Sequence, residues 1–211
     1  MNSVESLKWR YAVKKFDKNK MVPKHKIHIL KEAFNLTATS YGLQPIKLII
    51  IQNKTLQKSL VAHSWQQEQV AQASHVLVIC IQNTVDKSTV EAYFKMVKDI
   101  RNTPDEILKP FKDRMMDSFR KKPAEEIKAW SKNQAYLALG NLLTVCAIEK
   151  IDACPMEGFI PEKYDEKLKL DKHNLSSVLA LPIGFRAEDD YMKDLKKVRK
   201  DIKEMVLEID E

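Results

Sequence analysis

Short, mostly apolar runs in this chain alternate with longer segments whose apolar residues recur at helical spacing. Three of these runs predict buried strands, because they are short and rich in β-branched residues; they lie at Leu48–Ile51, His75–Ile81 and Ser177–Gly184. A shorter run at Asp152–Pro155 predicts a fourth strand, and Val206–Ile209 is a candidate for a terminal one.

Helical periodicity covers most of the remaining sequence. Ser3–Arg10 predicts a short helix, and Pro23–Asn35 predicts a second. The stretch from Lys54 to about Gln72 predicts a third, since neither glycine nor proline interrupts it. Ala124–Lys150 is the longest helix signal, and its part from Ala135 to Ile148 is apolar nearly all round. Such a helix is expected to be central and buried.

A charged segment over about 86–122 also has helical spacing, with an apolar stripe that includes Tyr93, Phe94 and Val97. Pro104 and Pro110 are expected to break it into pieces. Because its charges are of both signs, we interpret it as a helical excursion rather than a binding tail. Strands separated by helices predict an α+β (α/β) fold, in which one domain spans 1–211.

Glycine is scarce: the 211 residues hold only four, Gly42, Gly140, Gly158 and Gly184. Their spacing excludes both the G-x-G-x-x-G dinucleotide turn and the G-x-x-x-x-G-K-[ST] phosphate loop. The formal charge is +7, and residues 1–32 hold nine Lys or Arg against three Asp or Glu. Such a segment suits nucleic acid, a membrane surface or a phosphorylated small molecule. The small molecule is favoured, because no RNA-binding motif or zinc-finger spacing is present; a merely solvated basic surface is the alternative.

The three cysteines, Cys80, Cys146 and Cys154, form no C-x-x-C pair, which fits a reducing cytosol. We therefore expect a cytoplasmic protein, and no uncharged stretch reaches the roughly 20 apolar residues of a membrane span. His25 and His28 lie three apart on a helix, but no third ligand is near, so no metal site is expected. A hydrolase triad is not supported either, because the G-x-S-x-G motif is missing.

Three segments carry candidate chemistry. Arg10–Phe16 places cations where a helix is expected to end, which suits a phosphate. Pro155–Phe159 is a strand end whose Gly158 permits close approach to a planar ligand. Lys197 and Arg199 are two apart, so they point the same way in an extended chain.

Together these segments resemble the nitroreductase family of flavin mononucleotide (FMN) enzymes over essentially the whole chain. The similarity is greatest to the branch of oxygen-insensitive NAD(P)H nitroreductases and dihydropteridine reductases. The matching motifs are, in order, Arg10–Phe16, Thr39–Pro45, Ala73-Ser74-His75, Gly140–Leu143, Pro155–Phe159, and Lys197 with Arg199.

The resemblance implies an intertwined homodimer, a mixed but mostly antiparallel sheet surrounded by helices, and two FMN sites at the subunit interface. It implies that Arg10, Lys197 and Arg199 hold the phosphate, that Tyr11 and Ala12 touch ribityl and phosphate, and that Lys14 faces the pyrimidine. Further cofactor-binding positions are Pro155, Met156, Glu157 and Gly158 against the ring, Gln66 and Gln69, and Thr39, Ser40, Gly42 and Gln44 in a loop from the partner subunit.

In the chemistry that the resemblance implies, flavin carries hydride from NAD(P)H to nitroaromatic, quinone or similar electron-poor acceptors by a ping-pong mechanism. The Glu157 backbone N–H would lie near flavin N5, and no protein residue is required as a general acid. Tyr41, Trp65 and Met116 match substrate-binding positions, although Met116 suits an ordinary core equally well. Gln69 and Gly42 depart from the family pattern, which bears on the flavin potential and substrate preference. Dihydropteridine or enone reduction, and a flavin-binding protein with little turnover, are the alternatives.

Overall fold

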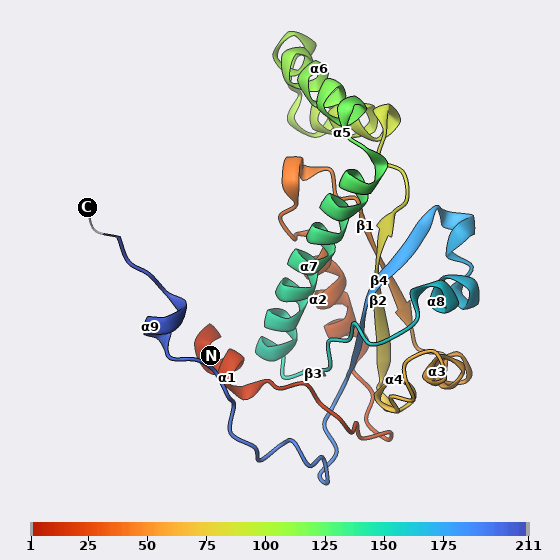
Figure 1. Cartoon of the computed structure of the whole chain (residues 1–211), viewed down its shortest axis with the longest axis vertical. Coiled ribbons are helices and arrows are strands. Elements are labelled where there is room, and N and C mark those ends of the chain that lie inside the picture. Colours follow the sequence, from red (N-terminus) through yellow and green to blue (C-terminus); the bar gives the residue numbers. More distant parts are fainter. Residues whose placement is uncertain (1, 210–211) are drawn as a thin grey trace.

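The computed structural model describes residues 2–209, in which a central β-sheet lies between two layers of helices (Figure 1). Within these residues the sheet has four strands in the order β1-β2-β4-β3, and each neighbouring pair is antiparallel. Beside β3, an isolated parallel bridge joins Ala12 to Ala153. The mostly antiparallel sheet and the α+β class are therefore confirmed. The strands are β1 (Ile46–Ile51), β2 (His75–Gln82), β3 (Asp152–Ala153) and β4 (Leu175–Gly184).

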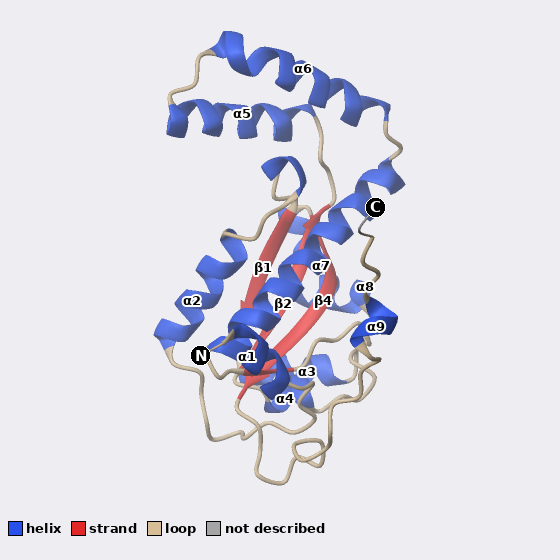
Figure 2. Cartoon of the chain, turned by 90° about the vertical axis from the view of Figure 1, so that its left-hand side faces the viewer, coloured by secondary structure: helices blue, strands red, loops and turns tan. Residues whose placement is uncertain are grey.

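Helices cover both faces of the sheet (Figure 2). The longest is α7, and no helix in residues 2–209 combines the length and apolar character that crossing a bilayer demands. The helices are α1 (Ser3–Trp9), α2 (Lys24–Asn35), α3 (Lys54–Val61), α4 (Gln69–Gln72), α5 (Lys87–Arg101), α6 (Asp105–Lys121), α7 (Ala124–Ile148), α8 (Pro161–Leu168) and α9 (Ile202–Met205), with short 3-10 helices η1 (Ser40–Gly42) and η2 (Leu170–His173).

Strand β2 divides the core, because its side chains alternate between two buried faces. Val76 and Val78 pack into a cluster with residues of α3, α4 and α8. Leu77 and Ile79 pack on the opposite face with residues of α2 and α7. The continuous apolar run that predicted this strand is thus explained by burial on both sides.

The predicted excursion is a hairpin of α5 and α6 beyond one end of the sheet (Figure 2). The chain turns at Asn102, which takes a left-handed conformation (φ 52°) and ends α5. The prediction that Pro110 breaks the segment is wrong, because α6 continues through it. A proline there removes one backbone hydrogen bond. The apolar cluster that includes Phe94, Met115 and Phe119 holds the two helices together despite that loss.

Two further differences lie in the C-terminal third. Helix α8 was not predicted, although Pro161 in its first turn is a typical helix start. The terminal strand at Val206–Ile209 does not form within the described chain; instead α9 is followed by irregular backbone. The segment that contains α9 and residues 206–209 leads away from the rest of the described chain, so residues 206–209 have no neighbouring strand with which to pair (Figure 1).

Candidate functional site

The segment after α1 carries the first half of the predicted phosphate site. Helix α1 ends at Trp9, and Arg10 has extended dihedral angles (φ −74°, ψ 145°) as its C-cap. The chain then runs beside β3, where the Val13 N–H donates to the Ala153 carbonyl at 3.4 Å. The backbone of Arg10–Phe16 is therefore fixed against the sheet edge.

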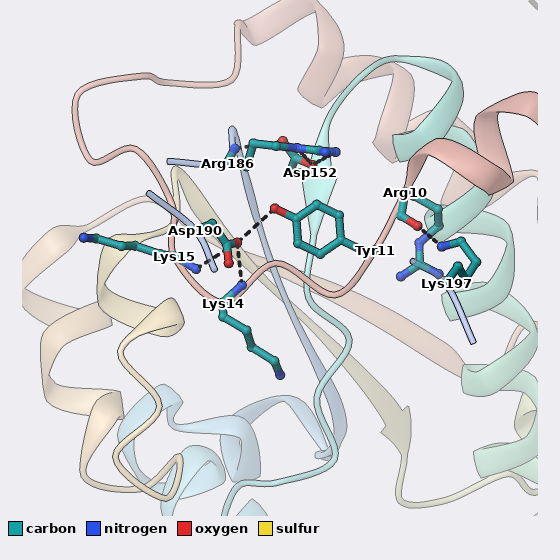
Figure 3. A network of polar contacts seen from close by, with 8 residues as sticks. All are labelled: Arg10, Tyr11, Lys14, Lys15, Asp152, Arg186, Asp190 and Lys197. Carbon is teal, nitrogen blue, oxygen red and sulfur yellow. Dashed lines mark hydrogen bonds and ion pairs between the residues drawn. The ribbon is translucent and has the colours of Figure 1, made fainter. Parts of the chain in front are cut away.

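The second half comes from the C-terminal part of the chain. Lys197 Nζ donates a hydrogen bond to the Arg10 carbonyl (Figure 3). The two segments line one cavity of about 460 Å³. The structure thus brings together all the residues that the sequence assigned to the phosphate and ribityl end: Arg10, Tyr11, Ala12, Lys197 and Arg199.

The cations of this cavity repel one another. Burial lowers the pKa of Arg10, and Arg199 lowers it further. The pKa of Lys197 is lowered by burial, by Arg10 and by Arg199. Within residues 2–209, none of these three has a carboxylate oxygen within 4.0 Å. A ligand with a phosphate group would supply the missing negative charge, so the residues present fit the phosphate of FMN.

Lys14 and Gln69 both influence the thiol of Cys154, the residue that directly follows β3. Burial raises the pKa of Cys154, whereas the charges of Lys14 and Arg10 and a hydrogen bond from Gln69 lower it. Cys154 directly precedes Pro155, so Lys14 and Gln69 lie at the start of the segment that was predicted to face the flavin ring. The roles of Lys14 at the pyrimidine end and of Gln69 near the ring stay predictions.

The segment Pro155–Gly158 is held at several points. Met156 forms a two-way bridge with Ala180, at 2.8 and 3.0 Å. The Glu157 carboxylate accepts a 2.7 Å hydrogen bond from the Tyr136 hydroxyl, which raises the pKa of Tyr136. The backbone N–H groups of Glu157 and Gly158 donate to no acceptor within the described residues. This arrangement leaves two donors available to a ring nitrogen or oxygen.

Contacts within the chain give a second reason for glycine at position 158. A Cβ at this position would lie 2.9 Å from Trp65 Cε3 and 2.9 Å from Gln67 Nε2. Gln67 Nε2 also donates to the Gly158 carbonyl at 2.9 Å. The absence of a side chain therefore accommodates Trp65 and Gln67, in addition to any planar ligand.

The loop that carries these residues interrupts the helix predicted for Lys54–Gln72. Trp65 and Gln66 both adopt positive φ angles, 52° and 59°, which residues other than glycine rarely do. Contacts distant in sequence hold the loop: Ser64 Oγ lies 2.7 Å from the Tyr164 hydroxyl, and the Ile160 N–H donates to the His63 carbonyl at 2.9 Å. Backbone strain of this kind is typical of functional sites, and Trp65 is left 69% exposed.

The loop Thr39–Gln44 lies at the opposite end of α7, near the α5–α6 hairpin (Figure 1). The Ser40 N–H donates to Gln134 Oε1 at 2.8 Å, whereas α1 packs at the other end, where Lys150 Nζ lies 4.3 Å from the Trp9 ring centre. Fourteen residues separate Gln134 from Ile148 in α7, about 21 Å of helix. Within one chain, the loop with Thr39, Ser40, Gly42 and Gln44 is therefore remote from the phosphate cavity.

The predicted substrate-binding residues are divided in the same way. Tyr41 packs against Phe119 of α6, with ring centres 6.1 Å apart. Met116 lines a cavity of about 590 Å³ with Phe119, Val90 and neighbouring residues. Trp65 lies instead beside Gly158. Within one chain, Tyr41 and Met116 thus lie at the α5–α6 hairpin, whereas Trp65 lies beside the segment Pro155–Gly158.

Two carboxylates that the sequence analysis did not single out bind residues in or beside the segment Arg10–Phe16 (Figure 3). The buried Asp152 binds Arg186, with 2.9 Å between Arg186 Nε and Oδ1, and the guanidinium lies 4.3 Å from the Trp9 ring centre. Asp190 accepts hydrogen bonds from the Tyr11 hydroxyl and the Lys14 N–H, both at 3.0 Å. No motif marks either residue, because their partners are distant in sequence.

Comparison with solved structures finds the same fold in several bacterial proteins. A Bacillus subtilis protein described as a nitroreductase has a TM-score of 0.87 at 16% identity, with 98% of each chain covered. A protein from Exiguobacterium sibiricum that is described as a nitroreductase, solved in complex with FMN, has a TM-score of 0.84 at 18% identity, covering 99% of this chain and 98% of that one. An enone reductase of gut-bacterial fatty acid saturation has a TM-score of 0.79 at 19% identity, covering 99% and 98%.

Sequence comparison points the same way. A Staphylococcus aureus protein with the provisional name NAD(P)H nitroreductase is 30% identical over 214 residues, which cover 96% of this chain and 95% of that protein. The model of the nitroreductase family matches residues 7–185. The chain therefore belongs to the nitroreductase family.

Proposed function

We propose that this protein is an FMN-dependent oxidoreductase that passes hydride from NAD(P)H through the flavin to nitroaromatic, quinone or similar electron-poor acceptors. The observation that carries the proposal is a cavity in which three mutually repelling cations, Arg10, Lys197 and Arg199, have no carboxylate oxygen within 4.0 Å among the described residues. A strand end whose two N–H groups donate to no described acceptor supports it. The FMN complex of a structural neighbour and the NAD(P)H nitroreductase names of the relatives support the same cofactors.

The proposed roles follow from these positions. Arg10, Lys197 and Arg199 would hold the phosphate, and Lys14 would face the pyrimidine end of the ring. When bound, FMN supplies the hydride chemistry. The Glu157 N–H would donate to N5, and Tyr136 holds the carboxylate of the same residue. These residues bind and orient, so the protein itself need not transfer a proton.

A homodimer with flavin at the interface would reunite the two separated halves of the site. The part of α7 between these halves carries apolar side chains that remain exposed: Leu137 is 54% exposed and Ile148 is 44% exposed. Gly140 lies on the same helix beside open space, because nothing lies within 4 Å of a Cβ added there. Beyond α9, Leu207 and Ile209 are also exposed, at 84% and 77%. We propose that a second copy covers this face and contributes the loop Thr39–Gln44, and that the C-terminal segment crosses to it.

Light scattering tests the dimer: we expect twice the mass of one chain, and a folded, flavin-loaded monomer would refute it. Complementation tests the shared site. A variant with a damaged loop and a variant without the phosphate cations should regain FMN binding when mixed and refolded, at about a quarter of the sites if subunits of a two-fold dimer assort randomly. Failure of the mixture to regain binding would contradict a loop that acts on the partner's site.

Tyr41, Trp65 and Met116 would then line one cavity above the flavin, where nicotinamide and oxidant bind in turn. Such a shared cavity gives ping-pong kinetics, and parallel double-reciprocal lines are expected. The cytoplasm is the proposed compartment, because the buried cysteines Cys80, Cys146 and Cys154 are all free thiols.

The first experiment is to reconstitute the protein with FMN, FAD or riboflavin and to reduce the loaded protein anaerobically with NADH or NADPH. We expect FMN to bind most tightly and NAD(P)H to bleach its absorption. Turnover of menadione and nitrofurazone, compared with an enone, then separates nitro or quinone reduction from the reaction of the enone reductase that shares this fold. A bound flavin that neither nucleotide reduces would refute the enzyme and favour a flavin-binding role.

A further inference from the structure

Asp190 is a buried carboxylate whose partners are hydrogen-bond donors rather than cations. Its exposure is 1%, and no Lys, Arg or His nitrogen within residues 2–209 forms an ion pair with it. Its Oδ2 accepts from the Lys14 N–H at 3.0 Å, the Lys15 N–H at 3.3 Å and the Tyr11 hydroxyl at 3.0 Å (Figure 3). Its Oδ1 accepts from the Met192 N–H at 3.0 Å. Four donors allow a buried carboxylate to stay ionised.

These hydrogen bonds join the two segments that carry the cations of the proposed phosphate site. Three of the donors belong to Tyr11, Lys14 and Lys15, in the segment that also bears Arg10. The acceptor belongs to the segment that continues to Lys197 and Arg199, which line the same cavity as Arg10. Asp190 therefore connects the two walls of that cavity.

The position of Asp190 in the chain makes this connection important. It is the last buried residue of the described chain, because every residue from 191 to 209 is exposed or only partly buried. Between Asp190 and Lys197 the backbone forms turns but no helix or strand. The two segments are also joined before Asp190, where the Ala187 N–H donates to the Lys15 carbonyl at 2.9 Å. Beyond Asp190, the hydrogen bond from Lys197 to the Arg10 carbonyl is a further link that keeps Lys197 near Arg10.

We infer that Asp190 is a positioning residue for the phosphate of FMN: by binding the backbone of Lys14 and Lys15 and the hydroxyl of Tyr11, it sets Lys197 and Arg199 opposite Arg10. This inference rests on the proposed function. It makes a prediction opposite in sign to simple electrostatics. Removing a negative charge near a bound anion should strengthen FMN binding, whereas removing the positioning residue should weaken it.

The neighbouring Asp189 provides a matched control. Its side chain is 69% exposed and forms only a surface ion pair with Lys15. The substitutions Asp190→Asn and Asp189→Asn remove the same charge from adjacent residues. Asn at 190 has one oxygen in place of two and an NH₂ group that faces the existing donors, so it cannot accept all four hydrogen bonds.

The experiment titrates apoprotein of both variants and of the wild type with FMN and with riboflavin, which lacks the phosphate, and follows flavin fluorescence. In Asp190→Asn we expect the preference for FMN over riboflavin to fall about tenfold or more, the size expected for losing hydrogen bonds to a charged acceptor. In Asp189→Asn the preference should stay within about twofold, as for an exposed ion pair. A merely structural role would weaken both ligands alike and leave their ratio unchanged.

Tyr11→Phe removes a single donor without changing the charge and serves where Asp190→Asn yields too little folded protein. Tyr11→Phe should also lower the preference for FMN over riboflavin, but by a smaller factor than Asp190→Asn. An unchanged or higher ratio in Asp190→Asn, or in Tyr11→Phe when that variant is used, would overturn the role of Asp190. Wild-type protein that prefers neither flavin would instead refute the proposed function, and this role with it.

Discussion

Substituting Arg199 with alanine should weaken FMN binding without destabilising the protein. The exposed Arg199 guanidinium donates, among residues 2–209, only to the Val198 carbonyl of its own segment, at 2.6 Å. It lowers the pKa of both Arg10 and Lys197 by repulsion. Its removal therefore breaks no ion pair among the described residues and relieves an unfavourable interaction. The melting temperature of the apoprotein should stay the same or rise slightly.

The loss in affinity is set by the charge-assisted hydrogen bond to the phosphate. Such a bond contributes about 1.5–3 kcal/mol, which corresponds to a Kd about 10- to 150-fold higher. The cavity retains Arg10 and Lys197, so binding is weakened rather than abolished. Because part of the effect is electrostatic, the difference between wild type and Arg199→Ala should shrink as salt is added.

Titration of apoprotein with FMN and with riboflavin at two salt concentrations measures these effects. Lys200→Ala is the control, because Lys200 is also an exposed cation but does not line the cavity. The reasoning would be refuted by an equal loss for both flavins, because the phosphate would then lie elsewhere. An equal loss in Lys200→Ala would show that net charge, rather than the cavity, binds the phosphate.

Three further predictions concern other parts of the molecule. Met116→Phe should change the relative rates with quinones and nitroaromatics while FMN affinity is retained, and an unchanged profile would make Met116 a core residue. Tyr136→Phe removes the hydrogen bond to Glu157 and should make the flavin midpoint potential more negative, measured by dye titration, with FMN affinity unchanged. Burial raises the pKa of Cys80 and of Cys146 to about 12. Unfolding above about pH 9 therefore releases protons, so stability should fall as pH rises from there, and less so in Cys80→Ala.

The sequence predicts the core of this fold well, because burial acts directly on residue type. The strand at His75–Ile81 is apolar on both faces since helices cover both, and the observed strand extends by a single residue. The long helix that begins at Ala124 is likewise found, ending two residues earlier than predicted. Where hydrophobic burial decides the structure, local pattern is sufficient.

The sequence-based predictions fail where contacts between residues distant in sequence determine the structure. No glycine or proline marks the end of α3 at Val61, and Trp65 and Gln66 are not residues that favour positive φ. The preceding residues Ser64 and His63 are bound by Tyr164 and Ile160, about a hundred residues away. A local hydrogen bond from the Gln66 N–H to the Val61 carbonyl, at 3.2 Å, closes the turn. In the candidate site, the cations were predicted through family motifs. Asp190 was not, because it acts on backbone N–H groups, which no sequence motif records.

The scarcity of glycine and the chemistry of the cavity are two aspects of one arrangement. A glycine-rich loop binds phosphate with backbone N–H groups that are neutral when the ligand is absent. Here charged side chains would do that work, and the apoprotein must keep Arg10, Lys197 and Arg199 close together against their repulsion. Two of the three lie on a segment with little burial of its own. The phosphate would remove the repulsion and bind both walls at once, so cofactor binding and order of the C-terminal segment should stabilise each other.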